Sequence, residues 1–247
     1  NEVCEKHGID ASKFDIVDNP DELKAVAQAV QLVHDGQGDV LMKGLCSTDK
    51  FLRAILNKET GLLPPKALLS HVGIIESPNY HKLLFLTDMA VVPLPDLKQK
   101  MTLANYVVKI ARSFGIAKPK VAFIAASEQV LASMPACLEA AALAKMADRG
   151  QIKGCIADGP LALDVAIDNE SVEIKKLTSP VAGDADCLVF PNIESANVFW
   201  KTNSKLSTGV RQAGMLVGTT APCILASRAD SVDTKLNSIA EAVMSVK

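Results

Sequence analysis

The C-terminal stretch TTAPCILASRADSVDTKLNSIAEAVMSV, residues 219–246, combines a short apolar run, a polar turn and an amphipathic helix pattern. Residues 223–226 have the length of a buried strand, and apolar residues then recur at helical spacing from Leu236 to Val243. The period changes at Ser227. A strand that runs directly into a helix is the repeating unit of α/β proteins, so this stretch indicates the fold class.

The turn in this stretch carries Ser227, Arg228, Asp230 and Ser231. Either Asp230 or Ser231 can cap the helix, which places free backbone N–H groups and the positive end of the helix dipole beside a guanidinium. This arrangement predicts an anion site. The alternative is an ordinary connection in which Ser and Asp only cap the helix and Arg228 is solvated.

Composition excludes several classes of protein. The chain has 247 residues, of which 49% are hydrophobic, so it can bury a large core. Its net charge is -2 and its 26 basic residues are scattered, which argues against nucleic acid or an anionic membrane as a partner. No apolar run is long enough to span a membrane. Six cysteines without a Cys-x-x-Cys pair indicate free thiols in a reducing cytoplasm, and the four histidines lack the spacing of a zinc site.

Strand and helix patterns alternate along the chain with short polar breaks. The patterns predict helices at 22–33, 48–56, 102–114, 135–146, 161–167 and 194–206, and strands at 40–43, 71–76, 83–87, 121–125, 154–157 and 187–190. The Ser77-Pro78-Asn79 turn predicts a hairpin between two of these strands. The alternation predicts mostly parallel strands with helices on both faces, repeated often enough for two sheets.

Polar residues follow several of the predicted strands. Asp88 comes after the strand at 83–87, Asp158 after the strand at 154–157, and Ser227 after the C-terminal strand. Ligands of α/β sheets bind at the carboxyl ends of the strands, so these residues together predict a cleft. Taken singly, Asp158 fits a plain turn and Asp88 fits a helix cap.

Three common catalytic motifs are absent from the sequence. It has no P-loop, no Gly-x-Gly-x-x-Gly and no Gly-x-Ser-x-Gly, so a P-loop nucleotidase, a Rossmann dehydrogenase and a serine hydrolase have no support. All four histidines, including His71, lie in the first third of the chain. A partnership between Ser227 and a histidine would therefore depend on long-range contacts.

Five motifs together resemble the phosphate acetyl/butyryl transferase family. They are DVLMKG, LLFLTD, MADRGQIKGCIADGPLALDVAI, SPVAGDADCLVFPNIESANVFWK and APCILASRADSVDTKLNSIA, and the likeness is strongest to the butyryltransferase branch. The resemblance implies reversible transfer of a short-chain acyl group, butyryl first of all, between coenzyme A and inorganic phosphate. It implies these two substrates and no separate cofactor, and a homo-oligomer built from dimers.

The resemblance also implies an isopropylmalate-dehydrogenase-like fold with two three-layer α/β domains and the active site in a cleft between them. Residues 1–67 plus 217–247 would form the first domain, and residues 68–216 the second. Family members carry a further β-α unit before a segment like 1–13, so we expect this chain to lack that unit. An uncovered sheet edge or apolar patch is then expected beside residues 40–42.

Residue roles follow from the matching motifs. Ser227 and Arg228 match the family's Ser-Arg pair, with Arg228 as the phosphate clamp and Ser227 as donor to the oxyanion or the departing sulfur. Arg53 matches an arginine linked to coenzyme A and phosphate. Asp88, Asp158 and Ser231 are further substrate-binding candidates.

The carboxylate that handles the thiol proton is not fixed by the motifs. Asp230 is one candidate, and Asp233 is the other, because the acetyltransferase branch places its acid where Asp233 and Thr234 stand. Three other functions stay open: a phosphate acetyltransferase, a β-decarboxylating dehydrogenase of the same fold, and a noncatalytic binder of coenzyme A or acyl phosphate. The last is favoured by Leu63, which replaces an arginine usual in the butyryltransferase branch.

Overall fold

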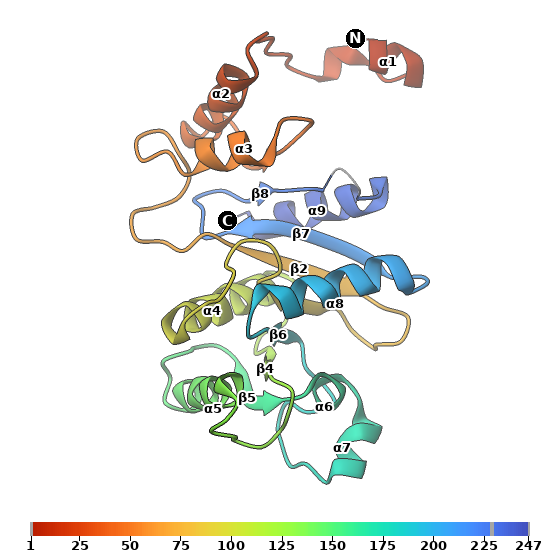
Figure 1. Cartoon of the computed structure of the whole chain (residues 1–247). Coiled ribbons are helices and arrows are strands. Elements are labelled where there is room, and N and C mark those ends of the chain that lie inside the picture. The colour runs from red at the N-terminus through yellow and green to blue at the C-terminus, as the bar shows by residue number, and fades with distance from the viewer. Residues whose placement is uncertain (1, 228–229, 247) are drawn as a thin grey trace.

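The chain forms a mixed α/β structure around one eight-stranded sheet. A computed structural model describes residues 2–227 and 230–246. The strand order is β1-β8-β7-β2-β3-β6-β4-β5, and Figure 1 shows the sheet extending from α2 and α3 at one end to α5, α6 and α7 at the other. The α/β fold class predicted from the sequence is confirmed.

The strands pair in both directions. Their bounds are β1 Leu41–Met42, β2 Ser70–Glu76, β3 Leu84–Thr87, β4 Lys120–Ile124, β5 Ile156–Leu161, β6 Cys187–Val189, β7 Arg211–Val217 and β8 Cys223–Ile224. The pairs β1–β8, β3–β6, β6–β4 and β4–β5 are parallel. The pairs β2–β3, β2–β7 and β7–β8 are antiparallel, and β2–β3 is the predicted hairpin.

The helices begin where the sequence supplies caps. They are α1 Glu2–His7, α2 Glu22–His34, α3 Thr48–Ile55, α4 Leu97–Ser113, α5 Pro135–Asp148, α6 Leu163–Ile167, α7 Asn169–Lys175, α8 Ile193–Leu206 and α9 Val232–Ser245, with a short 3-10 helix η1 at Ala11–Lys13. Asp21 caps α2, and Asp96 with Gln99 forms a capping box that starts α4 earlier than its apolar pattern predicts. Pro135 occupies the first turn of α5.

Three apolar clusters hold these helices against the sheet. Residues of α4, α5 and α9 pack in one cluster with inward-facing residues of β2, β4 and β7. Residues of α6 and α8 form a second cluster with alternate residues of the same sheet, such as Ile75 and Leu86. A third cluster joins α2 and α3 to β1 and β8. Burial of these side chains is the main term that stabilises the layers.

The prediction of two sheets is wrong, because among the described residues β7 joins the two halves into one sheet, in which four of the seven strand pairs are parallel. This strand, RQAGMLV, was not among the predicted strands, and it pairs along seven residues with β2 and at its end with β8. β8 also pairs in parallel with β1, as closure of a first domain by the last strand requires. The division into domains 1–67 plus 217–247 and 68–216 stays a prediction. β1 lies at an edge of the described sheet, with Met42 39% and Leu45 93% exposed.

One buried acid on α9 opposes the stability of this fold. The side chain of Glu241 is almost fully buried, and neither carboxylate oxygen has a hydrogen-bond partner among the described residues. Its neighbours around a small cavity include Phe114, Ala213 and Met244, with Glu76 and Arg211 also on the lining. Burial raises the pKa of Glu241 well above its ordinary value.

We therefore expect Glu241→Leu to raise the free energy of unfolding by about 2 kcal/mol at pH 8. A raised folded-state pKa means that the native protein binds the proton more tightly, so native stability falls as pH rises above the unfolded-state value. The gain should shrink as the pH approaches 4.5. Urea unfolding at several pH values measures this, with exposed Glu76→Gln as the control; equal gains at all pH values would contradict it.

Candidate functional site

The turn between β8 and α9 is held by its own side chains. The backbone N–H of Ser227 donates to Oδ2 of Asp230 at 2.7 Å, and the N–H of Asp230 donates to the carbonyl of Ser227 at 3.1 Å. Of the two predicted caps, Ser231 is the one that caps α9, because its Oγ accepts from the N–H of Thr234 at 3.0 Å. Arg228 lies outside the described residues, so its predicted role as phosphate clamp stays a prediction.

This turn borders a cavity of about 220 Å³. One side of the cavity is lined by the exposed face of α8. The other sides are lined by residues of β2, β7 and the start of α9. The lining residues are His71, Met89, Ala90, Asn197, Trp200, Lys201, Ser204, Lys205, Gly214, Leu225, Ala226, Ser227, Asp230, Thr234 and Ser238. Segments that are far apart in the sequence therefore meet at one place, at the carboxyl end of β8.

His71 is a buried imidazole on the lining of this cavity, with 6% of the residue exposed. Its Nδ1 lies 2.7 Å from the sulfur of Met89. A Cβ atom on Gly214 would lie 2.6 Å from its Cε1 and 3.1 Å from its Nε2, so the glycine leaves room for the ring. Burial lowers the pKa of His71, and the negative charges of Asp88 and Asp230 act in the opposite direction.

Asp88 lies behind the cavity and ties two segments together. Its Oδ1 accepts from the N–H groups of Ala90 and Val91 at 2.7 and 2.9 Å. Its Oδ2 accepts from Ser70 Oγ at 2.7 Å, from the N–H of His71 at 3.2 Å and from the N–H of Val92 at 3.3 Å. The buried carboxylate is thus fully used in fixing the start of β2 to the loop after β3.

Two lysines on α8 give the rim of the cavity a positive charge. Lys201 and Lys205 are exposed, one helical turn apart, and both line the cavity. Trp200 lies beside them, and Asn197 fixes the helix by donating from Nδ2 to the carbonyl of Met89 at 2.9 Å. These residues and His71 were not predicted as site residues from the sequence. The spacing of the two lysines was a visible signal, but nothing local related it to Ser227.

Other candidate residues lie away from this cavity. Arg53 is on α3, 78% exposed at its side chain, and pairs with Asp49 at 3.2 Å. Asp158 is on β5, at the far edge of the described sheet, where its Oδ1 accepts from the N–H of Gly159 at 2.8 Å. Asp233 is exposed and does not line the cavity, whereas Asp230 does. Of the predicted site residues that the structure describes, Ser227 and Asp230 line this cavity, whereas Arg53, Asp88, Asp158 and the α9 cap Ser231 do not.

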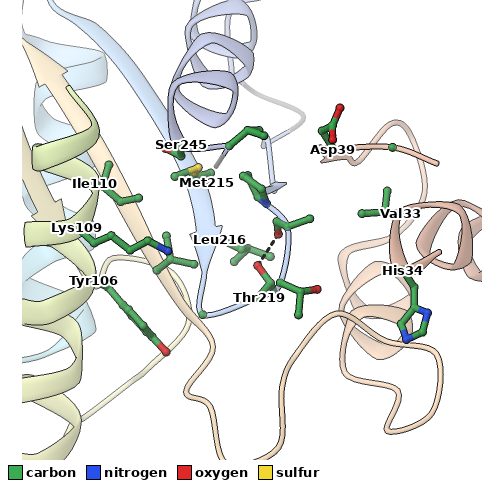
Figure 2. A pocket seen from close by; sticks show the side chains of 17 residues that line it. Val33, His34, Asp39, Tyr106, Lys109, Ile110, Met215, Leu216, Thr219 and Ser245 are labelled. Atoms are coloured by element: carbon green, nitrogen blue, oxygen red, sulfur yellow. Dashed lines mark hydrogen bonds between the residues drawn. The ribbon is translucent and has the colours of Figure 1, made fainter. Parts of the chain in front are cut away.

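A second, larger cavity of about 440 Å³ lies at the opposite end of β8 (Figure 2). Figure 2 shows Tyr106 and Lys109 of α4 on one side, His34 at the end of α2 on the other, and Thr219 in the turn between β7 and β8. This turn precedes β8, whereas Ser227 follows it. Because ligands of α/β proteins bind at the carboxyl ends of parallel strands, the smaller cavity is the stronger candidate for the reactive site.

The described residues do not favour a cysteine nucleophile or a metal centre. All six cysteines are free, and burial raises the pKa of Cys187 and raises that of Cys223 to about 12, so both are poor nucleophiles. No group of three or more metal-binding side chains occurs within residues 2–227 and 230–246. None of the helices in these ranges has the length and apolar character needed to cross a membrane.

Comparison with known proteins gives consistent matches along the chain. The family model described as Phosphate acetyl/butaryl transferase matches residues 1–243. A phosphate butyryltransferase of Clostridium acetobutylicum is 50% identical over 98% of this chain and 80% of its own length. A phosphate acetyltransferase of Rhizobium meliloti is 41% identical over 98% of this chain and 76% of its own. The crystal structure of a branched-chain phosphotransacylase from Enterococcus faecalis V583 has a TM-score of 0.88 and 32% identity, and the match covers 96% of this chain and 84% of that one.

The position of Asp88 predicts a large loss of stability for Asp88→Asn. The new amide nitrogen cannot accept hydrogen bonds, so it would face buried donors that the carboxylate now satisfies. We expect the free energy of unfolding to fall by about 3 kcal/mol or more, measured by urea titration. Ser70→Ala, which removes one donor, should cost about 1 kcal/mol. Equal effects of the two variants would show that the carboxylate does not hold this region.

Proposed function

Because this chain belongs to the phosphate acetyl/butyryl transferase family, we propose that it transfers a butyryl group reversibly between coenzyme A and inorganic phosphate at the cavity beside Ser227. One observation supports this site above all: Ser227 and Asp230 line the same cavity as two lysines of α8 and the apolar side chains of Met89, Trp200 and Leu225, which we call the apolar floor. In one direction the reaction consumes acyl-CoA and phosphate and releases acyl phosphate and the thiol.

The turn offers what an acyl transfer to phosphate needs. Phosphate is a poor nucleophile when solvated, so it must be held close to the thioester carbonyl in a defined orientation. The start of α9 contributes the positive end of a helix dipole, and we assign Arg228 as the guanidinium that binds phosphate oxygens. Ser227 lines the cavity, and we assign its hydroxyl as the donor to the negative charge that develops on the carbonyl oxygen.

The acyl chain and the coenzyme meet different parts of the cavity. Met89, Trp200 and Leu225 supply apolar surface next to Ser227, which suits a short hydrocarbon chain. Lys201 and Lys205 at the rim suit the phosphate groups of coenzyme A. We therefore propose that the acyl group points toward the apolar floor and that the coenzyme leaves the cavity across α8.

Two alternatives remain testable in the same assay. A phosphate acetyltransferase is favoured by the 41% identity to such an enzyme, and a noncatalytic binder is favoured by Leu63. Thiol release from butyryl-CoA, acetyl-CoA and branched acyl-CoAs, with and without phosphate, separates them. Phosphate-dependent release that is fastest with butyryl-CoA supports the proposal, and no release with any thioester supports the binder.

We also propose that the protein works in the cytoplasm as a homo-oligomer built from dimers. The six free cysteines agree with a reducing compartment. An exposed apolar stripe on α9, with Val232, Leu236 and Val243, agrees with a surface that another chain or segment covers. Sedimentation velocity measures the oligomeric state.

Replacing Ser227 or Arg228 with alanine should change different kinetic constants. Arg228→Ala is expected to raise the KM for phosphate and to lower turnover by about 10²-fold or more, because a preorganised donor to phosphate is lost. Ser227→Ala is expected to lower kcat with little change in phosphate affinity, because its hydroxyl acts as charge develops. Steady-state kinetics decide this. Unchanged kinetics in Arg228→Ala would reduce the turn to a plain helix cap.

The rim lysines should affect binding of the coenzyme and not the chemical step. We expect the double variant Lys201→Ala, Lys205→Ala to raise the KM for coenzyme A about tenfold, with kcat changed less than about twofold. The effect should weaken at high ionic strength, because the interaction is between exposed charges. Lys145→Ala on α5, which removes an exposed lysine paired with Asp148, is the matched control. An unchanged KM would place the coenzyme elsewhere.

A further inference from the structure

We propose that His71 is a catalytic residue and that its Nε2 accepts the proton of the coenzyme A thiol when acyl phosphate is converted to acyl-CoA. This inference rests on the proposed function and adds a residue to it. The site needs such a group, because a thiol attacks as the thiolate. The motifs point only to carboxylates for this role, and neither Asp230 nor Asp233 is well placed.

The carboxylate candidates are limited by their contacts. Asp230 accepts the N–H of Ser227 at 2.7 Å, so one of its oxygens is committed to holding the turn. Asp233 is exposed and outside the cavity lining, and Thr234, which does line it, carries no acid. Imidazole is also a better match to a thiol than a carboxylate is. Its ordinary pKa of about 6.5 lies closer to the ordinary thiol pKa of about 8.5 than the ordinary pKa of a carboxylate does.

The contacts of His71 leave Nε2 available as a base. The sulfur of Met89 can only accept, so the 2.7 Å contact is satisfied when Nδ1 carries the ring proton. The lone pair is then on Nε2, at the edge of the ring that lies over Gly214, and both residues line the cavity. Asp88 holds the backbone of His71 at 3.2 Å and thereby fixes where the ring is placed.

Burial favours the neutral form of the His71 imidazole, against the negative charges near it. Burial lowers its pKa, and this effect outweighs the opposing influence of Asp88 behind the ring and Asp230 on the turn. Among the described residues, Lys201 and Lys205 on α8 are the other charged side chains on the cavity lining. A neutral imidazole is the form that can take up a proton.

The proton transfer balances with the group transfer. The S–H bond breaks, its proton moves to Nε2, and the sulfur electron pair forms the bond to the carbonyl carbon. The bond from that carbon to the phosphate oxygen then breaks, its electron pair leaves with phosphate, and the imidazolium passes the proton to the released phosphate, which restores the neutral ring. In the opposite direction Nε2 takes the proton of hydrogen phosphate as the phosphate attacks and gives it to the departing thiolate.

The test is the pH dependence of kcat for butyryl phosphate and coenzyme A in His71→Gln, which keeps a polar nitrogen near Nε2 but cannot take up a proton. We expect kcat to fall about 10²-fold or more with the KM for coenzyme A nearly unchanged. In the wild type, kcat should fall as the pH drops through the His71 pKa, and His71→Gln should lack this acid limb. His81→Gln, at an exposed histidine bound to Asp184, should behave as the wild type.

Gly214→Ala gives an independent test that retains the imidazole. The added methyl would lie 2.6 Å from Cε1, so the ring must move, and kcat should fall while the acid limb stays or shifts. If His71→Gln does not fold, nitrogen-15 spectra of histidine in the wild type decide. A neutral ring protonated at Nδ1 near pH 7.5 supports the proposal, and an Nε2–H tautomer or an imidazolium overturns it.

The outcomes separate this proposal from the proposed function. A wild-type protein that forms no acyl-CoA from any acyl phosphate contradicts the function itself. An active wild type together with a His71→Gln variant of equal kcat and equal pH profile overturns only the role of His71.

Discussion

The antiparallel pairing of β2 with β7 is the constraint on which the rest of the structure depends. Seven residue pairs, from Ser70–Val217 to Glu76–Arg211, join segments that are about 140 residues apart in the sequence. This pairing makes one sheet of the two halves and delivers the chain to β8 beside β1. It also sets Gly73 opposite Gly214, so that His71 lies across from the last part of β7.

The same pairing explains why glycines are needed at this point. A Cβ on Gly73 would lie 2.7 Å from the ring of Trp200, and one on Gly214 would meet the ring of His71. The two glycines therefore make room on one face of the sheet for the ring of Trp200 and the imidazole of His71. Met89 lies between these groups, and Asp88 anchors the loop that carries it. The contacts that join β2 to β7 and to the loop after β3 therefore also position the residues of the cavity.

Local patterns in the sequence predict much of the fold and one side of the site. The β8–α9 unit, the hairpin and most helices follow from period, turns and caps that lie within a few residues of each other. Ser227, Asp230 and Ser231 could be predicted as site candidates for the same reason. β7 could not be predicted, because Arg211, Gln212 and Gly214 weaken its apolar pattern and long-range pairing decides its structure. His71 joins the site only through that pairing, so no local signal identifies it. The spacing of Lys201 and Lys205 is visible in the sequence, but nothing local relates these lysines to Ser227.

The smaller cavity beside Ser227 is the proposed reactive site, and the larger cavity takes no part in the proposed chemistry. A crystal structure of the protein with coenzyme A and phosphate tests this most directly. We predict the thiol sulfur beside Ser227 and His71, with the phosphate groups of the coenzyme near Lys201 and Lys205 of α8. Coenzyme A seated instead in the larger cavity, between Tyr106, Lys109 and Thr219, would contradict the central claim.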